Sequence, residues 1–216
     1  MGATHKMPFG IPAKVKKMAF KSEKYGNGKE SLLRAAKELF GEYGYAETTF
    51  KKISERAGVA PGLLAHHFGN KEQLFIASGL DVLENLLLYL DASIAGAPNG
   101  YAGVLSFCRA YLEFSIAKDS FWLVLVRCSP YSDIKASAGR ELILSRFTAV
   151  HDKLEKLLAR GIEDGSIVQN DPHILTHTIM AILVGVNRTR VLTPYSPPAL
   201  YDKALEFVSR AIRNNS

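Results

Sequence analysis

The sequence predicts an all-α protein of about nine helices, and three observations support this prediction. Apolar residues recur at helical spacing from residue 27 onward, and no segment shows the strict alternation of a half-buried strand. Helix-starting signals stand where these segments begin, as at Asp171 followed by Pro172. The 216 residues, 47% of them hydrophobic and 22% charged, are enough to form a full buried core.

Residues 1–25 differ in composition from the rest of the chain. They contain six lysines and two prolines, and they show no sustained periodicity. This composition predicts a flexible basic arm.

Three predicted helices follow over residues 26–74. The first begins after Asn27 and ends near Gly44, and its predicted buried face contains Leu32, Ala36, Leu39 and Tyr43. The second is capped by Thr49 and ends at Gly58; its predicted buried stripe is Phe50, Ile53 and Ala57. The third begins at Pro61 and runs to Phe68. Two short helices joined by a glycine turn behind a longer one predict a helix-turn-helix domain.

The rest of the chain, residues 75–216, is predicted to form a larger helical domain. The predicted helices are 71–92, 103–117, 120–128, 134–160, 172–191 and 199–213.

The positive charge of the protein is unevenly distributed. The net charge is +6; the first 80 residues contain thirteen of the 27 basic residues but only seven of the 21 acidic ones, so they account for all of it. This asymmetry is typical of a protein that meets a polyanion at one end, although a basic tail beside a neutral domain would also produce it. No apolar run reaches the length of a membrane span, so we expect a cytoplasmic protein without membrane contact.

The sequence offers no convincing catalytic or metal-binding pattern. Cys108 and Cys128 lie in apolar helical patterns without metal-ligand spacing, so we expect buried free thiols. His66 and His67 are adjacent, and their side chains therefore diverge by about 100° on a helix. We expect no metal, no cofactor and no enzymatic activity.

Residues 44–75, GYAETTFKKISERAGVAPGLLAHHFGNKEQLF, closely resemble the N-terminal signature of the TetR (tetracycline-repressor) family of bacterial regulators. The matching positions are Gly44, Tyr45, Thr48, Thr49, Ile53, Ala57, Gly58, Val59, Gly62, Leu64, His66, Phe68, Lys71, Glu72 and Leu74. Three positions depart from the family pattern: Ala60, Leu63 and Ala65 replace a usual Ser, Thr and Tyr.

The resemblance implies that the third helix reads DNA and that Thr49 and Lys71 contact backbone phosphates. Helix N-termini suit phosphate without a charged side chain, Pro61 and Leu63 can meet thymine methyl groups, and His66 can bond a base edge. The predicted DNA-binding residues are Thr49, Lys51, Pro61, Gly62, Leu63, Ala65, His66, His67 and Lys71.

The family layout also implies an effector cavity among the later helices, where the sequence is rich in aromatic residues. A plain hydrophobic core is the competing interpretation. The cavity candidates are Phe107, Tyr111, Phe114, Trp122, Arg127, His177, Met180 and Asn187. Such a lining suits a largely apolar effector, with Arg127 available for an anionic group.

The last two predicted helices are apolar on more than one face, which indicates a neighbour besides the chain's own core. A second subunit would complete a four-helix bundle, whereas a helix wholly within its own domain remains the alternative. The dimer-interface candidates are Ala181, Gly185, Leu200, Ala204, Phe207 and Ala211.

These observations predict a homodimeric repressor that binds a palindromic double-stranded DNA operator and is released by a small effector. Two other interpretations remain open. One is a TetR-like DNA-binding protein controlled by a protein partner, and the other is an all-helical small-molecule-binding protein or enzyme.

Overall fold

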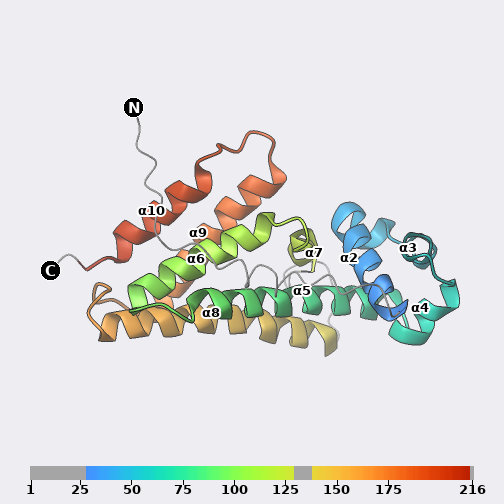
Figure 1. Ribbon diagram of the computed structural model, residues 1–216, viewed down its shortest axis with the longest axis horizontal. Helices are drawn as coiled ribbons and strands as arrows, with labels where there is room; N and C mark the ends of the chain where they lie inside the picture. Colours follow the sequence, from blue (N-terminus) through green and yellow to red (C-terminus); the bar gives the residue numbers. More distant parts are fainter. Residues whose placement is uncertain (1–27, 129–137, 215–216) are drawn as a thin grey trace. The chain divides into compact units, whose positions relative to one another are not determined.

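The computed structural model describes residues 28–128 and 138–214, and these contain nine α-helices (Figure 1). The helices are α2 (Gly28–Glu47), α3 (Phe50–Ala57), α4 (Pro61–Phe68), α5 (Lys71–Ile94), α6 (Gly100–Ile116), α7 (Trp122–Arg127), α8 (Ala138–Glu163), α9 (Pro172–Leu192) and α10 (Leu200–Ile212). In the described part of the chain, pairing of the strand type is limited to an isolated bridge between Ile167 and Arg213. The all-α prediction is confirmed, while the predicted arm, residues 1–25, lies outside the described residues.

The described residues pack as two compact units. The head unit contains residues 28–87, 113–128 and 138–153, and the body unit contains residues 88–112 and 154–214. Helices α5, α6 and α8 each contribute residues to both units. The helix-turn-helix segment therefore shares its compact unit with α7 and with parts of these longer helices.

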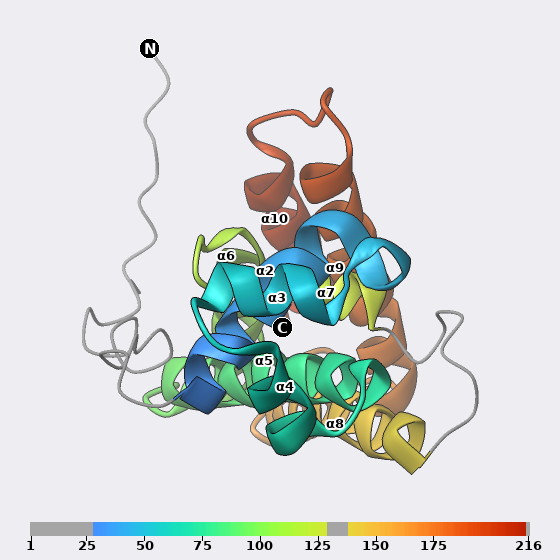
Figure 2. The same cartoon turned by 90° about the vertical axis from the view of Figure 1, so that its right-hand side faces the viewer.

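In the head unit, α2 packs against α3, α4 and α7 (Figure 2). Leu32, Ala36 and Leu39 are buried on its inner face, as the sequence predicts. Tyr43 was predicted on the same face, but it is 48% exposed. The reason is that Tyr43 directly precedes Gly44, whose φ of 81° and ψ of 177° interrupt the helix before the face reaches its next buried position.

An aromatic cluster holds the chain beyond this interruption. The ring of Phe75 on α5 meets Phe40 edge-on at 4.9 Å and Tyr45 at 5.1 Å between ring centroids. Thr48 is fully buried, and its hydroxyl donates to the Gly44 carbonyl at 2.7 Å, with the Leu39 carbonyl 3.2 Å from the same oxygen. These contacts fix the approach of the chain to α3.

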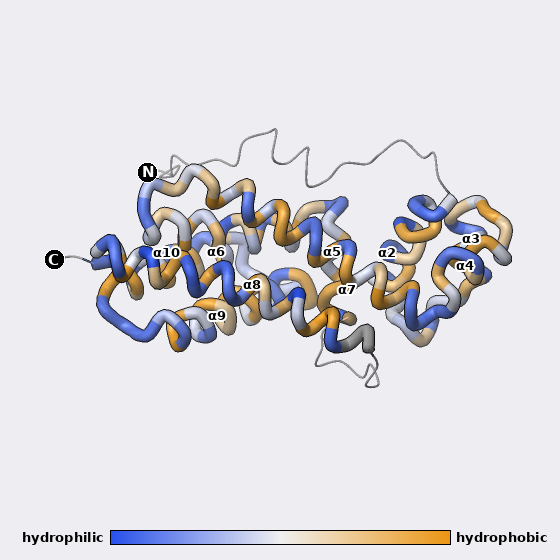
Figure 3. Tube along the Cα trace, turned by 90° about the horizontal axis from the view of Figure 1, so that it is seen from below, coloured by the Kyte–Doolittle hydropathy of each residue, from blue (hydrophilic) through white to orange (hydrophobic). Residues whose placement is uncertain are grey.

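In the body unit, α9 packs on α10, and apolar residues recur along both helices at helical spacing (Figure 3). The inner face of α9 buries Ile179, Met180 and Leu183, and the inner face of α10 buries Leu205 and Val208. Each helix also exposes an apolar side chain elsewhere.

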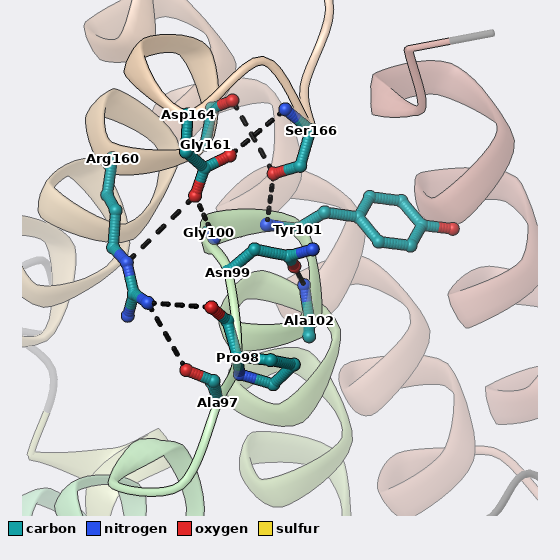
Figure 4. Close-up of polar contacts among 10 residues, drawn as sticks. All are labelled: Ala97, Pro98, Asn99, Gly100, Tyr101, Ala102, Arg160, Gly161, Asp164 and Ser166. Carbon is teal, nitrogen blue, oxygen red and sulfur yellow. Dashed lines mark hydrogen bonds and ion pairs between the residues drawn. The ribbon is translucent and has the colours of Figure 1, made fainter.

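A polar cluster in the body unit fixes the start of α6 (Figure 4). The Asp164 carboxylate accepts hydrogen bonds from the Gly100 amide at 2.7 Å and the Ser166 amide at 3.0 Å. Hydrogen bonding to the Ser166 side chain, followed by the bond from the Gly100 amide, lowers the pKa of Asp164. The Ser166 hydroxyl accepts from the Tyr101 amide at 3.1 Å, and Arg160 donates to the Pro98 carbonyl at 3.1 Å. Because these groups satisfy the first amides of α6, the helix begins at Gly100, three residues before its predicted start.

Helix α5 is long and apolar enough to cross a membrane by length and composition, and half of its most apolar window is buried within the structure. The core helices of soluble proteins meet the same test. The burial in this case comes from packing partners such as Phe40, which contacts the first turns of α5.

Candidate nucleic-acid interface

Thr49 begins α3 and caps it. Its backbone is extended, and its hydroxyl oxygen accepts a hydrogen bond from the Lys52 amide at 3.3 Å. The buried Ile53 holds the helix against the head-unit core. At the other end, Gly58 adopts a left-handed conformation with φ of 67° and ψ of 32°, which a residue with a Cβ enters only at a cost. This glycine makes the turn between α3 and α4.

Helix α4 has one buried face and one open face. Leu64 and Phe68 pack inward, while Pro61, Gly62, Ala65 and His66 are exposed. Pro61 lies in the first turn, where a backbone amide has no partner within the helix, so the missing N–H of proline costs nothing. Ala60, at the cap position, makes no side-chain hydrogen bond to the helix. No bulky side chain therefore covers the N-terminus of this helix, so a polyanion can approach its free amides closely.

Two of the predicted DNA-contacting residues on α4 are only partly open to solvent. A Cβ at Gly28 would lie 2.7 Å from the Leu63 Cδ2 atom, so Leu63 packs against the first residue of α2. His67 is half-buried, and its ring lies edge-on to the His66 ring at 5.2 Å. The predicted DNA-contacting residues that are exposed on this helix are therefore Pro61, Gly62, Ala65 and His66.

Lys71 is the first residue of α5, and its ammonium is held in place. The Nζ atom donates to the Tyr45 carbonyl at 2.9 Å and lies 4.3 Å from the centre of the Tyr45 ring. A lysine ammonium has three donors, so the carbonyl uses only one of them. The structure thus offers a half-buried, preorganised cation at the place where the family lysine was expected.

The lysine pair in the first turn of α3 is exposed, and the sequence alone does not distinguish DNA-contacting lysines from ordinary solvated ones at these two positions. Lys52 is the residue with an anchor: its Nζ atom donates to the Glu47 carbonyl at 2.8 Å and lies 5.7 Å from the Tyr43 ring centre. The signal that could have found it is the position of Lys52 three residues after the Thr49 cap.

Most of the predicted cavity residues are buried, but they belong to different units. In the body unit, Phe107 and Tyr111 stack with ring centroids 6.4 Å apart, and Met180 and Asn187 are also buried. In the head unit, Phe114 and Trp122 meet edge-on at 6.3 Å. Burial alone fits both a cavity lining and a plain core.

Two cavity candidates occupy other positions than the sequence predicted. The Arg127 guanidinium donates from Nε to the Gly41 carbonyl at 3.1 Å, because the end of α7 packs against the end of α2, whose carbonyls lack helical partners. His177 is exposed, and its ring lies 4.6 Å from that of His173, which contacts Glu155. Neither side chain points into the interior of its unit.

The predicted interface residues mostly lie on the outer faces of α9 and α10. Ala181, Gly185 and Ala211 are exposed, and Phe207 is 62% exposed. Leu200 is half-buried. Ala204 differs from the others: it is only 7% exposed and lies on the side of α10 that also buries Leu205.

The two cysteines are buried, as the sequence predicts. Burial raises the pKa of both thiols, Cys108 and Cys128, to about 12, so neither forms an appreciable amount of reactive thiolate at neutral pH. In the described residues, no group of three or more His, Cys, Asp or Glu side chains is arranged to hold a metal ion.

A capped α3, a glycine turn and an open α4, flanked by exposed lysines, define a helix-turn-helix protein of the DNA-binding class. Residues 32–78 match the family model described as "Bacterial regulatory proteins, tetR family". The HTH-type transcriptional repressor AcnR of Corynebacterium efficiens is 38% identical over 188 residues, which cover 87% of this chain and 93% of AcnR. The chain belongs to the TetR family of transcriptional regulators.

Solved structures show the same fold. A regulator from Saccharomonospora viridis in complex with choline aligns with a TM-score of 0.77 at 12% identity, over 87% of this chain and 98% of that one. AibR in complex with isovaleryl coenzyme A and operator DNA aligns with a TM-score of 0.68 at 16% identity, over 84% and 98% of the two chains. These relatives are transcriptional regulators: the AibR structure contains operator DNA, and AcnR is named as a repressor.

Proposed function

We propose that this regulator is a cytoplasmic repressor that binds a palindromic operator as a homodimer and leaves it when a small effector binds. The observation that carries the proposal is the open N-terminal half of α4, with Lys71 anchored at the start of the next helix. This arrangement can place a helix terminus against a DNA groove while a fixed ammonium contacts the phosphate backbone.

The outer faces of α9 and α10 support the dimer. Ile174, Val184 and Phe207 are each at least half exposed, although they are large and apolar. In the described part of the chain, no atom lies within 4 Å of the Cβ position of Gly185 on α9, so a second helix can approach it closely. A twofold-related copy would cover these side chains. Binding of such a dimer to successive major grooves requires two α4 helices about 34 Å apart.

The body unit supports an effector that is largely apolar but contains a hydrogen-bond acceptor. Asn187 is 2% exposed, and its Nδ2 atom has no hydrogen-bond partner among the described residues, whereas its Oδ1 atom accepts from the Tyr201 hydroxyl at 3.4 Å. An unsatisfied buried donor costs about 1–3 kcal/mol. A carbonyl or carboxylate oxygen of an effector would remove this cost, and the stacked rings of Phe107 and Tyr111 would contact its apolar part.

Selection of bound duplexes from a random DNA pool tests the proposal. A palindromic consensus is expected, and sedimentation of the purified complex should give two protein chains per duplex. Choline and isovaleryl coenzyme A, with which two of the structural relatives form complexes, are the first compounds to test for release of the selected DNA. The absence of any enriched duplex at moderate salt would contradict DNA recognition, and a single chain per duplex would contradict the dimer.

A further inference from the structure

The turn at Gly44 is flanked by two lysines that are held in the same manner. On one side, Lys71 donates to the Tyr45 carbonyl and lies over the Tyr45 ring. On the other side, Lys52 donates to the Glu47 carbonyl at 2.8 Å and lies 5.7 Å from the Tyr43 ring centre. Each anchor restrains a long flexible side chain, so less rotamer entropy is lost when the ammonium later binds an anion.

Lys52 occupies a helix position that is unfavourable for a cation. It is the third residue after the Thr49 cap, where Glu or Gln completes a capping box by accepting a hydrogen bond from the cap amide. A lysine cannot accept that bond, and its charge lies at the positive end of the helix dipole. The first turn of α3 contains no acidic residue to compensate. A residue that breaks a local rule in this way is expected where function requires it.

We infer that Lys52 is a backbone-phosphate contact of the DNA interface, with the Tyr43 ring as the support of its ammonium. The inference rests on the proposed DNA-binding function and extends it to Lys52 and Tyr43, which are not among the positions that match the family pattern. A phosphate between Lys52 and the Thr49-capped start of α3 neutralises the unfavourable charge and meets the free amides of the helix. Tyr43 acts through its ring, because its hydroxyl is bonded to Glu42, and this contact raises the pKa of Tyr43.

A purely structural role makes the opposite prediction. If Lys52 served to join α3 to the Glu47 carbonyl, removing its ammonium would lower the stability of the head unit. If it is retained for phosphate, Lys52→Gln restores a capping box with Thr49, so stability stays equal or rises while DNA affinity falls. The two readouts therefore change in different directions.

The experiment compares full-length wild type, Lys52→Gln and Lys156→Gln on a duplex selected from the random pool. Lys156 is an exposed lysine of α8 that belongs to the body unit, so its substitution removes the same charge away from the proposed interface. For Lys52→Gln we expect a dissociation constant about tenfold higher and a plot of log affinity against log salt that is flatter by about 0.9 for each protomer engaged. Its melting temperature should be unchanged or higher.

An unchanged salt slope for Lys52→Gln, or a slope change equal to that of Lys156→Gln, would overturn the phosphate contact. A lower melting temperature without a change in slope would assign Lys52 to structure alone. If the wild-type protein selects no duplex, the proposed function fails and the inference fails with it. If the wild-type protein binds DNA and Lys52→Gln binds it equally well, only the inference fails.

Discussion

Replacing Gly44 with alanine tests how the turn between α2 and α3 is held. The backbone of Gly44 has φ of 81° and ψ of 177°, a conformation that essentially only glycine adopts. A Cβ at this position would also lie 3.0 Å from the Nη1 atom of Arg127. The substitution therefore combines backbone strain with displacement of a neighbouring guanidinium.

The expected magnitude follows from these two contributions. Strain in a sparsely populated backbone region costs about 1–3 kcal/mol. A shift of the Arg127 guanidinium weakens its 3.1 Å hydrogen bond to the Gly41 carbonyl, which adds about 1 kcal/mol. We expect Gly44→Ala to lower the free energy of unfolding by about 2–4 kcal/mol.

Gly58→Ala is the matched control, because Gly58 also has a positive φ of 67° but nothing within 4 Å of its Cβ position. We expect it to cost about 1–2 kcal/mol from the left-handed backbone alone. Urea unfolding followed by circular dichroism at one fixed protein concentration measures both variants. The reasoning is wrong if Gly44→Ala costs no more than Gly58→Ala. It is also wrong if the difference between them persists unchanged in an Arg127→Ala background, where no guanidinium remains to displace.

Three further predictions concern DNA binding and pH. Lys71→Ala should weaken binding to all duplexes and flatten the salt slope by about one unit for each protomer, measured by fluorescence anisotropy; an unchanged slope would refute the phosphate contact. Uracil in place of thymine at half-site positions should weaken binding by about 1 kcal/mol in wild type but less in Pro61→Ala; equal losses would remove Pro61 as a reader of the methyl group. Hydrogen bonds from Ser166 and Gly100 lower the pKa of Asp164 in the folded protein. The ionised carboxylate therefore stabilises the fold fully at a pH above the unfolded pKa of about 4. This stabilisation is lost as the pH falls through the lower pKa of the folded state. Asp164→Asn should therefore melt at a lower temperature than wild type at pH 7, with a gap that narrows towards pH 3.5; a constant gap would contradict the assignment.

The sequence was sufficient for the helix-turn-helix because its determinants are local. The Thr49 cap, the Gly58 turn and the first-turn Pro61 each act within a few residues, and all three lie at the predicted helix ends. The prediction that Tyr43 is buried was wrong because periodicity carries a helical face forward without regard to the interruption at Gly44.

The contact of Arg127 and the start of α6 could not be predicted from the sequence for a different reason. Arg127 binds a carbonyl 86 positions earlier, and Gly100 is fixed by a carboxylate 64 positions later. A spacing rule along one helix contains no information about such partners. The same limit applies to Asn187, whose unsatisfied amide becomes visible only when the surrounding side chains are in place.

The exposed face of α4 sets a limit on direct sequence reading. Among Pro61, Gly62, Ala65 and His66, only His66 has a side chain that can hydrogen-bond a base edge, and a good base contact is worth about 1–3 kcal/mol of discrimination. Specific binding usually exceeds non-specific binding by about 4–10 kcal/mol. One histidine in each half-site therefore leaves much of this difference to methyl contacts and to the shape and deformability of the duplex. Anchored lysines suit this kind of recognition, since phosphates held at fixed positions report the path of the backbone rather than the identity of the bases.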